Sequence, residues 1–110
     1  MANSVVQAGS CAPGRCRTYR QAVEVATGNA LAAARHLLQH SERLAAVLSL
    51  TIFIAAEPDF PSHSKFADMA SDHLRDQLGD LAIGARAALG VYSLPSAAPV
   101  EVQVIFAVVS

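Results

Sequence analysis

The chain has 110 residues, of which 53% are hydrophobic and 15% are charged, whereas roughly 25% of the residues of an average soluble domain are charged. This length fits a single domain with one hydrophobic core, and the scarcity of charge predicts apolar surface that other copies of the chain cover. The formal net charge of −1 offers no positive field for a phosphate backbone, so nucleic acid is not expected as a partner.

The first predicted element is a short strand over residues 3–8, which is closed by Gly9 and followed by a turn-rich segment. That segment holds two cysteines, Cys11 and Cys16. A zinc site needs further ligands close by, so we interpret both cysteines as reduced thiols, with a short disulfide as the alternative. The basic residues of this region are Arg15, Arg17 and Arg20. We interpret this cluster as a solvated face rather than a phosphate-binding patch.

Two helices are predicted where small or apolar residues recur at every third or fourth position. The first covers residues 21–39 and carries a face of small side chains, which suits close packing on a sheet. The second covers residues 64–78, has Phe66 and Leu74 on its apolar face, and ends at Gly79.

Three more strands are predicted from the alternation of side chains along the sequence. In the run over residues 43–58, the side chains expected to point the same way are Leu48, Leu50, Ile52 and Ile54. Residues 86–92 form a further strand candidate. Residues 100–109 form the clearest strand, because every even-numbered residue in this range is apolar.

The apolar run over residues 44–56 is shorter than the roughly 20 residues that a membrane-spanning helix needs. The first residues of the chain also lack the charged and then apolar pattern of a signal peptide. We therefore expect a cytoplasmic protein with no membrane anchor.

This order of elements predicts an α+β fold with one sheet and two helices on one of its faces. The helices are expected to cover the face with Leu48, Leu50 and Ile52 and the even-numbered residues of the last strand. The other face, which includes Phe53 and Ile105, is half apolar, and no predicted element remains to cover it. We therefore expect other subunits to cover it.

The histidines give no metal-binding motif. His36 and His40 lie four residues apart on the first predicted helix, but no third ligand is evident, so a surface pair is the favoured interpretation. His63 and His73 stand alone, and we interpret them as ordinary surface or edge residues rather than catalytic bases. The sequence also lacks a nucleophile elbow and a glycine-rich phosphate loop.

Two charges, Arg86 and Glu101, interrupt the apolar segment from Gly84 to Phe106. Each lies near the start of a predicted strand, so the two side chains become neighbours if these strand ends meet. A guanidinium there can hold a planar carboxylate through two parallel hydrogen bonds. Spacing alone favours the simpler alternative, a structural salt bridge between Arg86 and Glu101.

This segment, "GARAALGVYSLPSAAPVEVQVIF", resembles the signature of the RidA (YjgF) family of reactive intermediate deaminases. The family pattern is an arginine, a short apolar strand, Leu-Pro, a loop, and then valine or isoleucine followed by glutamate. Two other segments, "GNALAAARHLL" and "FADMASDHL", are similar to the family's helices, and "RLAAVLSLTIFIAAEPDF" is similar to the strand and loop between them. The resemblance covers residues 21–109 and is strongest to a bacterial subgroup with "ASD" and "ARxAxGVxxLP".

The resemblance implies a chorismate-mutase-like sandwich with a mixed sheet, which assembles as a homotrimer with an active site in each cleft between subunits. It implies hydrolysis of 2-imino or enamine acids, small carboxylate-bearing substrates, to 2-keto acids and ammonia without a metal or cofactor. Arg86 matches the arginine that binds the substrate carboxylate, and Glu101 matches the glutamate that positions the attacking water. Further substrate-binding candidates by this resemblance are Gly9, Ala88 and Asp68.

The chain departs from the family pattern at its start, in the shortened loop "CAPGRCRTYR" before the first helix, and at position 68. Residues 1–20 are atypical within the single domain of residues 1–110, because Gly9 matches a family glycine while the family's first strand and its tyrosine have no counterpart. Asp68 stands where many members have asparagine, and a negative charge facing the cleft opposes the binding of anions. Two alternatives stay open: a trimeric keto-acid or carboxylic-acid binding protein with little or no turnover and, less favoured, an endoribonuclease of the L-PSP type.

Overall fold

The computed structural model describes residues 3–10 and 18–110, and within residues 3–10 it describes only the backbone. The described helices and strands follow one another as β1 (Asn3–Ser10), α1 (Tyr19–His36), β2 (Arg43–Ala55), α2 (His63–Leu78), β3 (Ile83–Val91) and β4 (Val100–Val109). A turn of 3₁₀ helix, Pro95–Ala97, precedes β4. Every predicted helix and strand is present, with ends that differ by a few residues. The interpretations of four residues lie outside the described part of the chain: Cys11, Cys16, Arg15 and Arg17.

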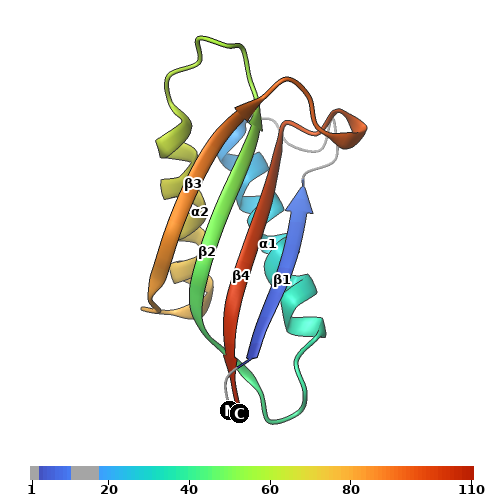
Figure 1. The fold of residues 1–110 in the computed structure, drawn as a ribbon, viewed down its shortest axis with the longest axis vertical. Helices are drawn as coiled ribbons and strands as arrows, with labels where there is room; N and C mark the ends of the chain where they lie inside the picture. Colours follow the sequence, from blue (N-terminus) through green and yellow to red (C-terminus); the bar gives the residue numbers. More distant parts are fainter. Residues whose placement is uncertain (1–2, 11–17) are drawn as a thin grey trace.

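The four described strands form one mixed sheet in the order β1-β4-β2-β3. β4 pairs antiparallel with both β1 and β2, whereas β3 pairs parallel with β2. Both helices lie on the same face of this sheet, behind the strands in Figure 1. Neither α1 nor α2 has the length and apolar character that crossing a membrane requires. The predicted α+β class, the mixed sheet and the one-sided helix layer are therefore confirmed.

The core lies between the helices and the sheet. The even-numbered residues of β4 are at most 2% exposed: Val100, Val102, Val104, Phe106 and Val108. α1 faces the sheet with small side chains one turn apart: Ala22, Ala26, Ala30 and Ala34. Because these side chains are short, the helix can approach the strands closely. The predicted small-residue face of the first helix and the apolar face of the last strand thus meet in one core.

β2 contains a bulge that strict alternation does not predict. Val47 and Ser49 pair with successive residues of β4, so Leu48 between them is an extra residue on this strand. The extra residue reverses the alternation of side chains, and Val47 is 1% exposed while Leu48 is 49% exposed. The prediction that Leu48 faces the core is therefore wrong. The rest of that predicted face is fully buried, as expected: Leu50, Ile52 and Ile54.

β3 follows the same irregularity as its neighbour. Ile83 pairs with Val47 and Ala85 pairs with Ser49, so Gly84 lies beside Leu48. A Cβ on Gly84 would lie 2.6 Å from the Leu48 carbonyl oxygen. The close approach of the two backbones therefore requires glycine at position 84.

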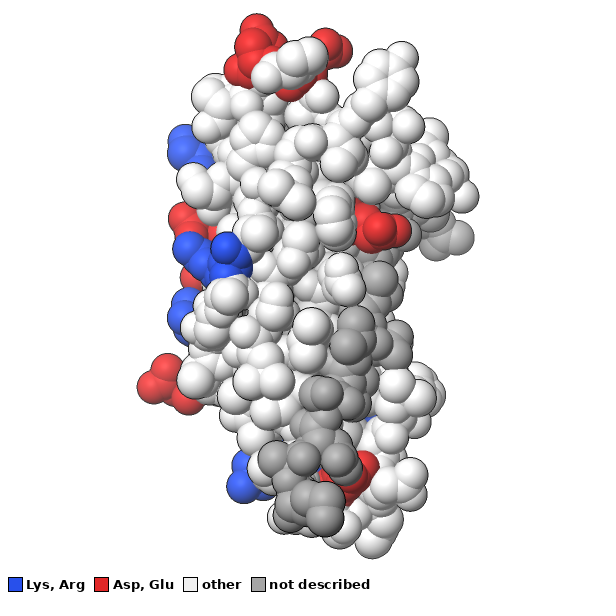
Figure 2. Space-filling model, in the orientation of Figure 1, with Lys and Arg blue, Asp and Glu red and all other residues white. Residues whose placement is uncertain are grey.

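No described element covers the sheet face opposite the helices. This face carries half-buried side chains of β2 and β4, among them Thr51, Phe53 and Ile105. Figure 2 views it and shows a mostly uncharged surface, with the charged side chains toward its edges. That other subunits cover this face stays a prediction.

The bulge leads to a test with two leucines of the same strand. Leu50→Ala removes a fully buried side chain, and we expect it to lower the free energy of unfolding by about 2–5 kcal/mol. Leu48→Ala shortens a side chain that is half exposed, and the expected loss is below about 1 kcal/mol. Urea unfolding of both variants at equal protein concentration measures the two losses. Equal losses would contradict the bulge.

Candidate functional site

Arg86 is the fourth residue of β3, which is an edge strand of the sheet. It pairs with Leu50 of β2, and paired residues of neighbouring strands point to the same face. Because Leu50 is fully buried on the helix side, Arg86 also points to the helix side. At the edge of the sheet its side chain keeps 38% of its surface exposed.

Two side chains of α2 hold the Arg86 guanidinium. Its Nη1 donates hydrogen bonds to Asp68 Oδ1 at 2.9 Å and to Ser71 Oγ at 3.1 Å. These two acceptors are three positions apart, so they lie on the same face of the helix. Ser71 is 2% exposed, whereas the Asp68 side chain is 61% exposed. The serine is therefore a fixed acceptor, and the aspartate is an acceptor that solvent or a ligand can replace.

Arg86 also borders a hollow of about 280 Å³ on the helix side of β3. The other lining residues are His63, Ser64, Ala67 and Ala88. Both hydrogen bonds described above use Nη1, and arginine has five N–H donors in a planar fork. The guanidinium therefore keeps donors for a second carboxylate. Three predicted site residues, Asp68, Arg86 and Ala88, are brought together here.

Glu101 lies elsewhere in the fold. It is the second residue of β4 and pairs with Phe53 of β2, so it points to the face opposite the helices. Arg86 and Glu101 thus lie on opposite faces of the sheet and on different sides of β2. The interpretation as a structural salt bridge is wrong, because the acidic partner of Arg86 is Asp68.

Gly9 belongs to the same part of the sheet as Glu101. Its backbone on β1 pairs with Val102 of β4, and the next pair along is Ser10 with Glu101. The predicted site residues therefore form two groups within one chain, one beside α2 and the other on β1 and β4. A site that uses both groups needs a second chain.

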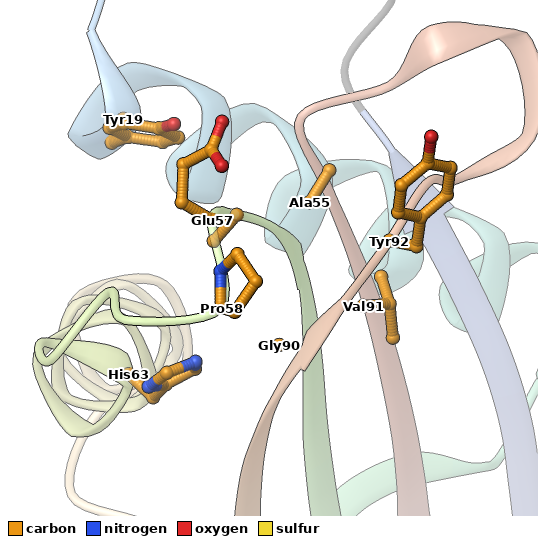
Figure 3. Close-up of a pocket in the computed structure, with 9 residues that line it drawn as sticks. Tyr19, Ala55, Glu57, Pro58, His63, Gly90, Val91 and Tyr92 are labelled. Atoms are coloured by element: carbon orange, nitrogen blue, oxygen red, sulfur yellow. The ribbon is translucent and has the colours of Figure 1, made fainter.

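A larger cavity, of about 710 Å³, opens where β2 and β3 end (Figure 3). Its ionisable side chains are Tyr19, Glu57, His63 and Tyr92. β2 and β3 are parallel neighbours, and ligand sites commonly form beyond the carboxyl ends of parallel strands. The sequence interpretation missed this cavity. One feature of the sequence could have indicated it. The order strand, helix, strand over residues 43–91 is typical of two parallel strands, beyond whose carboxyl ends such a cavity can form.

His63, interpreted from sequence as an ordinary surface residue, lines both hollows. Its ring lies edge-on to Phe60, with the ring centroids 5.3 Å apart. On β3, a Cβ on Gly90 would lie 2.6 Å from His63 Nε2. The imidazole thus occupies space that glycine leaves open, and its position is fixed from two sides.

The other described polar clusters offer less. His73 Nδ1 lies 3.9 Å from Glu24 Oε2, so this pair connects α2 with α1. Within residues 18–110, no three histidine, cysteine, aspartate or glutamate side chains are grouped to hold a metal ion. Among the described residues, the candidate binding groups therefore lie in the two hollows along β3.

No protein-family model and no curated protein sequence matches the chain, but solved structures do. A protein of unknown function from Agrobacterium tumefaciens matches with a TM-score of 0.74 and 26% identity, over 93% of this chain and 72% of the other. The YjgF gene product from E. coli has a TM-score of 0.62 and 14% identity, over 94% of this chain and 80% of the other. E. coli TdcF with bound serine has a TM-score of 0.59 and 14% identity, over 96% and 79%. At these identities the E. coli proteins show a shared fold.

The Asp68 contact leads to a test of what competes for Arg86. Asp68→Asn removes the carboxylate that lies 2.9 Å from Nη1, so a ligand carboxylate no longer has an internal competitor. We expect the Kd for pyruvate, measured by titration calorimetry, to fall by about 3- to 10-fold. Asp76→Asn makes the same change of net charge at another exposed position of α2, and it should leave the Kd unchanged. An unchanged or higher Kd in Asp68→Asn would contradict competition.

Proposed function

The chain has the fold of the RidA (YjgF) family, and on this premise we propose that it hydrolyses 2-imino acids, or their enamine tautomers, to 2-keto acids and ammonia. The observation that carries the proposal is Arg86, whose guanidinium borders a hollow at the free edge of the sheet. TdcF, which shares the fold, is a protein with bound serine, a small molecule that also bears a carboxylate. This supports a carboxylate-bearing substrate here.

Arg86 binds the substrate carboxylate in this proposal. Arginine and carboxylate form two parallel N–H···O bonds, which fix the plane of the substrate as well as its position. The hydrogen bond to the buried Ser71 restricts the arginine before the substrate arrives, so less conformational entropy is lost on binding. The substrate carboxylate then takes the place of Asp68 beside the guanidinium.

Glu101 of a second copy completes the site. Because Arg86 and Glu101 of one chain point to opposite faces of the sheet, the two groups meet only across an interface. A homotrimer with clefts between subunits provides such a meeting. The face opposite the helices carries few charges outside the grey residues (Figure 2) and half-buried apolar side chains such as Phe53 and Ile105, which supports this assembly because apolar surface is commonly buried against another chain.

The reaction needs one base that later donates the same proton. Glu101 accepts a proton from water while the water oxygen attacks the imine carbon, and the π electrons of the C=N bond move to nitrogen, which takes up a proton from solvent. The resulting carbinolamine then breaks its C–N bond as the hydroxyl oxygen forms the carbonyl. Glu101 returns its proton to the leaving nitrogen, the hydroxyl proton goes to solvent, and ammonia departs. Orientation of the substrate and general base catalysis each contribute about 10²-fold or more.

The contact between Asp68 and Arg86 favours a second candidate function. An internal carboxylate at 2.9 Å weakens the binding of an anionic substrate, and a weakly occupied site turns over slowly. The second candidate is therefore a trimer with little or no turnover, which binds keto or carboxylic acids only at concentrations high enough to displace Asp68 from Arg86.

A coupled assay tests the deaminase. The protein is added to an amino-acid dehydratase that releases the imine, and we expect faster formation of the keto acid. Glu101→Gln should lower this acceleration by about 10² or more through loss of the base, and Arg86→Ala by at least about 10-fold through loss of the carboxylate bond. Arg75→Ala, an exposed residue of α2, is the matched control and should keep the wild-type rate. No acceleration by the wild type would refute the deaminase, and thermal stabilisation by keto acids without turnover would favour the second candidate.

Mixed assemblies test the shared site. Arg86→Ala chains alone are expected to keep at most about a tenth of the wild-type activity, and Glu101→Gln chains alone about a hundredth or less. When both are coexpressed in equal amounts, a site that takes its arginine and its glutamate from different chains is intact in about a quarter of cases, so about a quarter of the wild-type activity should return. If both groups came from one chain, no site would be intact, and a mixture no more active than the separate variants would rule out the shared site.

A further inference from the structure

The cavity of about 710 Å³ at the ends of β2 and β3 has no part in the function proposed above. We propose that this cavity is the subsite for the substrate side chain, and that Glu57 selects substrates whose side chain ends in an ammonium or guanidinium group. The inference rests on the proposed function for the carboxylate end of the substrate, and on the cavity itself for the other end.

The cavity and the Arg86 hollow are adjacent along one strand. Every second residue of β3 lies on its helix-side face: Arg86, Ala88 and Gly90. These three pair with the core-facing residues of β2, Leu50, Ile52 and Ile54. The hollow holds Arg86 and Ala88, the cavity holds Gly90, and His63 lines both. Four residues of strand span about 13 Å. In this proposal the substrate chain runs from Arg86 along the strand, past the His63 ring that lies against Gly90, to Glu57 in the cavity.

The cavity lies between two walls that come from different parts of the chain. Figure 3 shows Tyr19, Glu57, Pro58 and His63 along one side, and Gly90, Val91 and Tyr92 along the other. Its volume is in the range of about 300–1,000 Å³ that is usual for small-molecule sites. The space is therefore large enough for a side chain the size of lysine or arginine.

The charge of the cavity favours a cation. Among the described residues that line it, Glu57 carries the negative charge and none is lysine or arginine. The Glu57 side chain is exposed and has neither an ion-pair nor a hydrogen-bond partner in the described part of the chain. The exposed rings of Tyr19 and Tyr92 add aromatic faces, to which cations are attracted. An ammonium or guanidinium group is therefore the ligand group that the charge of this cavity favours.

The wall that carries these groups is held in place by packing. Phe66, which is 4% exposed, lies 5.0 Å from Tyr19 and 5.6 Å from Phe60 between ring centroids. Phe60 in turn contacts His63. Burial in the core accounts for the position of the Phe66 ring. The aromatic cluster around it restricts Tyr19 and His63, which lie on either side of Glu57 (Figure 3). The aromatic part of this wall is therefore formed before a ligand binds, while the exposed Glu57 side chain moves to meet the ligand.

Two carboxylates of similar length test the subsite, 6-aminohexanoate and hexanoate, which differ by an ammonium group at the far end. We expect titration calorimetry at low ionic strength to give a Kd about 2- to 5-fold lower for 6-aminohexanoate, in line with one ion pair to an exposed carboxylate. Glu57→Gln should abolish this preference without changing the Kd for hexanoate. Asp59→Asn, an exposed carboxylate two residues further on that does not line the cavity, should keep the preference.

The controls separate this proposal from the carboxylate site. Arg86→Ala should weaken both acids equally and leave their ratio unchanged. A third probe, hexylammonium, has no carboxylate, and its binding should depend on Glu57 but not on Arg86. If neither acid binds, the proposed function fails while Glu57-dependent binding of hexylammonium still supports the subsite. Equal Kd values for the two acids in the wild type, a preference that survives Glu57→Gln, or no Glu57-dependent binding of any probe would overturn it.

Discussion

The pairing of β2 with two different neighbours determines where every candidate functional group lies. β2 is parallel to β3 on one side and antiparallel to β4 on the other. Paired residues point to the same face of a sheet. Arg86 therefore lies on the helix side with its partner Leu50, and Glu101 lies on the opposite face with its partner Phe53. The hydrophobic alternation of one central strand thus separates the two charges. It also places the carboxyl ends of β2 and β3 together, and the larger cavity opens there.

The Arg86 ion pair is suited to exchange rather than to structural support. Both partners are partly exposed, with 38% of the arginine side chain and 61% of the aspartate side chain in contact with solvent. Ion pairs in such positions contribute about 0–1 kcal/mol, so replacing Asp68 by a ligand carboxylate costs little. Ser71 is different, because a buried hydroxyl that loses its partner stays unsatisfied. The guanidinium is therefore anchored on one side and exchangeable on the other.

The sequence predicts those features that depend on local pattern. The alternation of β4 from Val100 to Val108 and the recurrent alanines of α1 identify the core, because both patterns reflect burial on one face. The resemblance to a family singles out Arg86 and Glu101, and the comparisons confirm the fold. Their roles in a reaction stay a proposal.

Three features were beyond local pattern, for different physical reasons. The bulge at Leu48 depends on register between strands, and an apolar residue in an apolar run gives no sign of which face it takes. The Asp68 partner of Arg86 lies 18 residues away and is brought close by the packing of α2 on β3. The cavity depends on side chains from three regions of the chain, and His63 looks ordinary until the space left by Gly90 is known.

The irregularity shared by β2 and β3 also limits how the length of this chain can change. Leu48 and Gly84 are each one residue more than regular alternation needs, and they lie side by side in the parallel ladder. β2 pairs with β3 from Val47 onward, so loss of Leu48 alone would shift Val47 by one place against Ile83, and the two strands would then present mismatched faces there. Loss of both residues would keep the register of β2 with β3 and remove the bulge at Leu48, while the second irregularity of β2 against β4, between Leu44 and Ala46, would remain. Among relatives of this chain, single-residue deletions at these two sites are therefore expected to occur as a pair, although 36 positions separate them in the sequence.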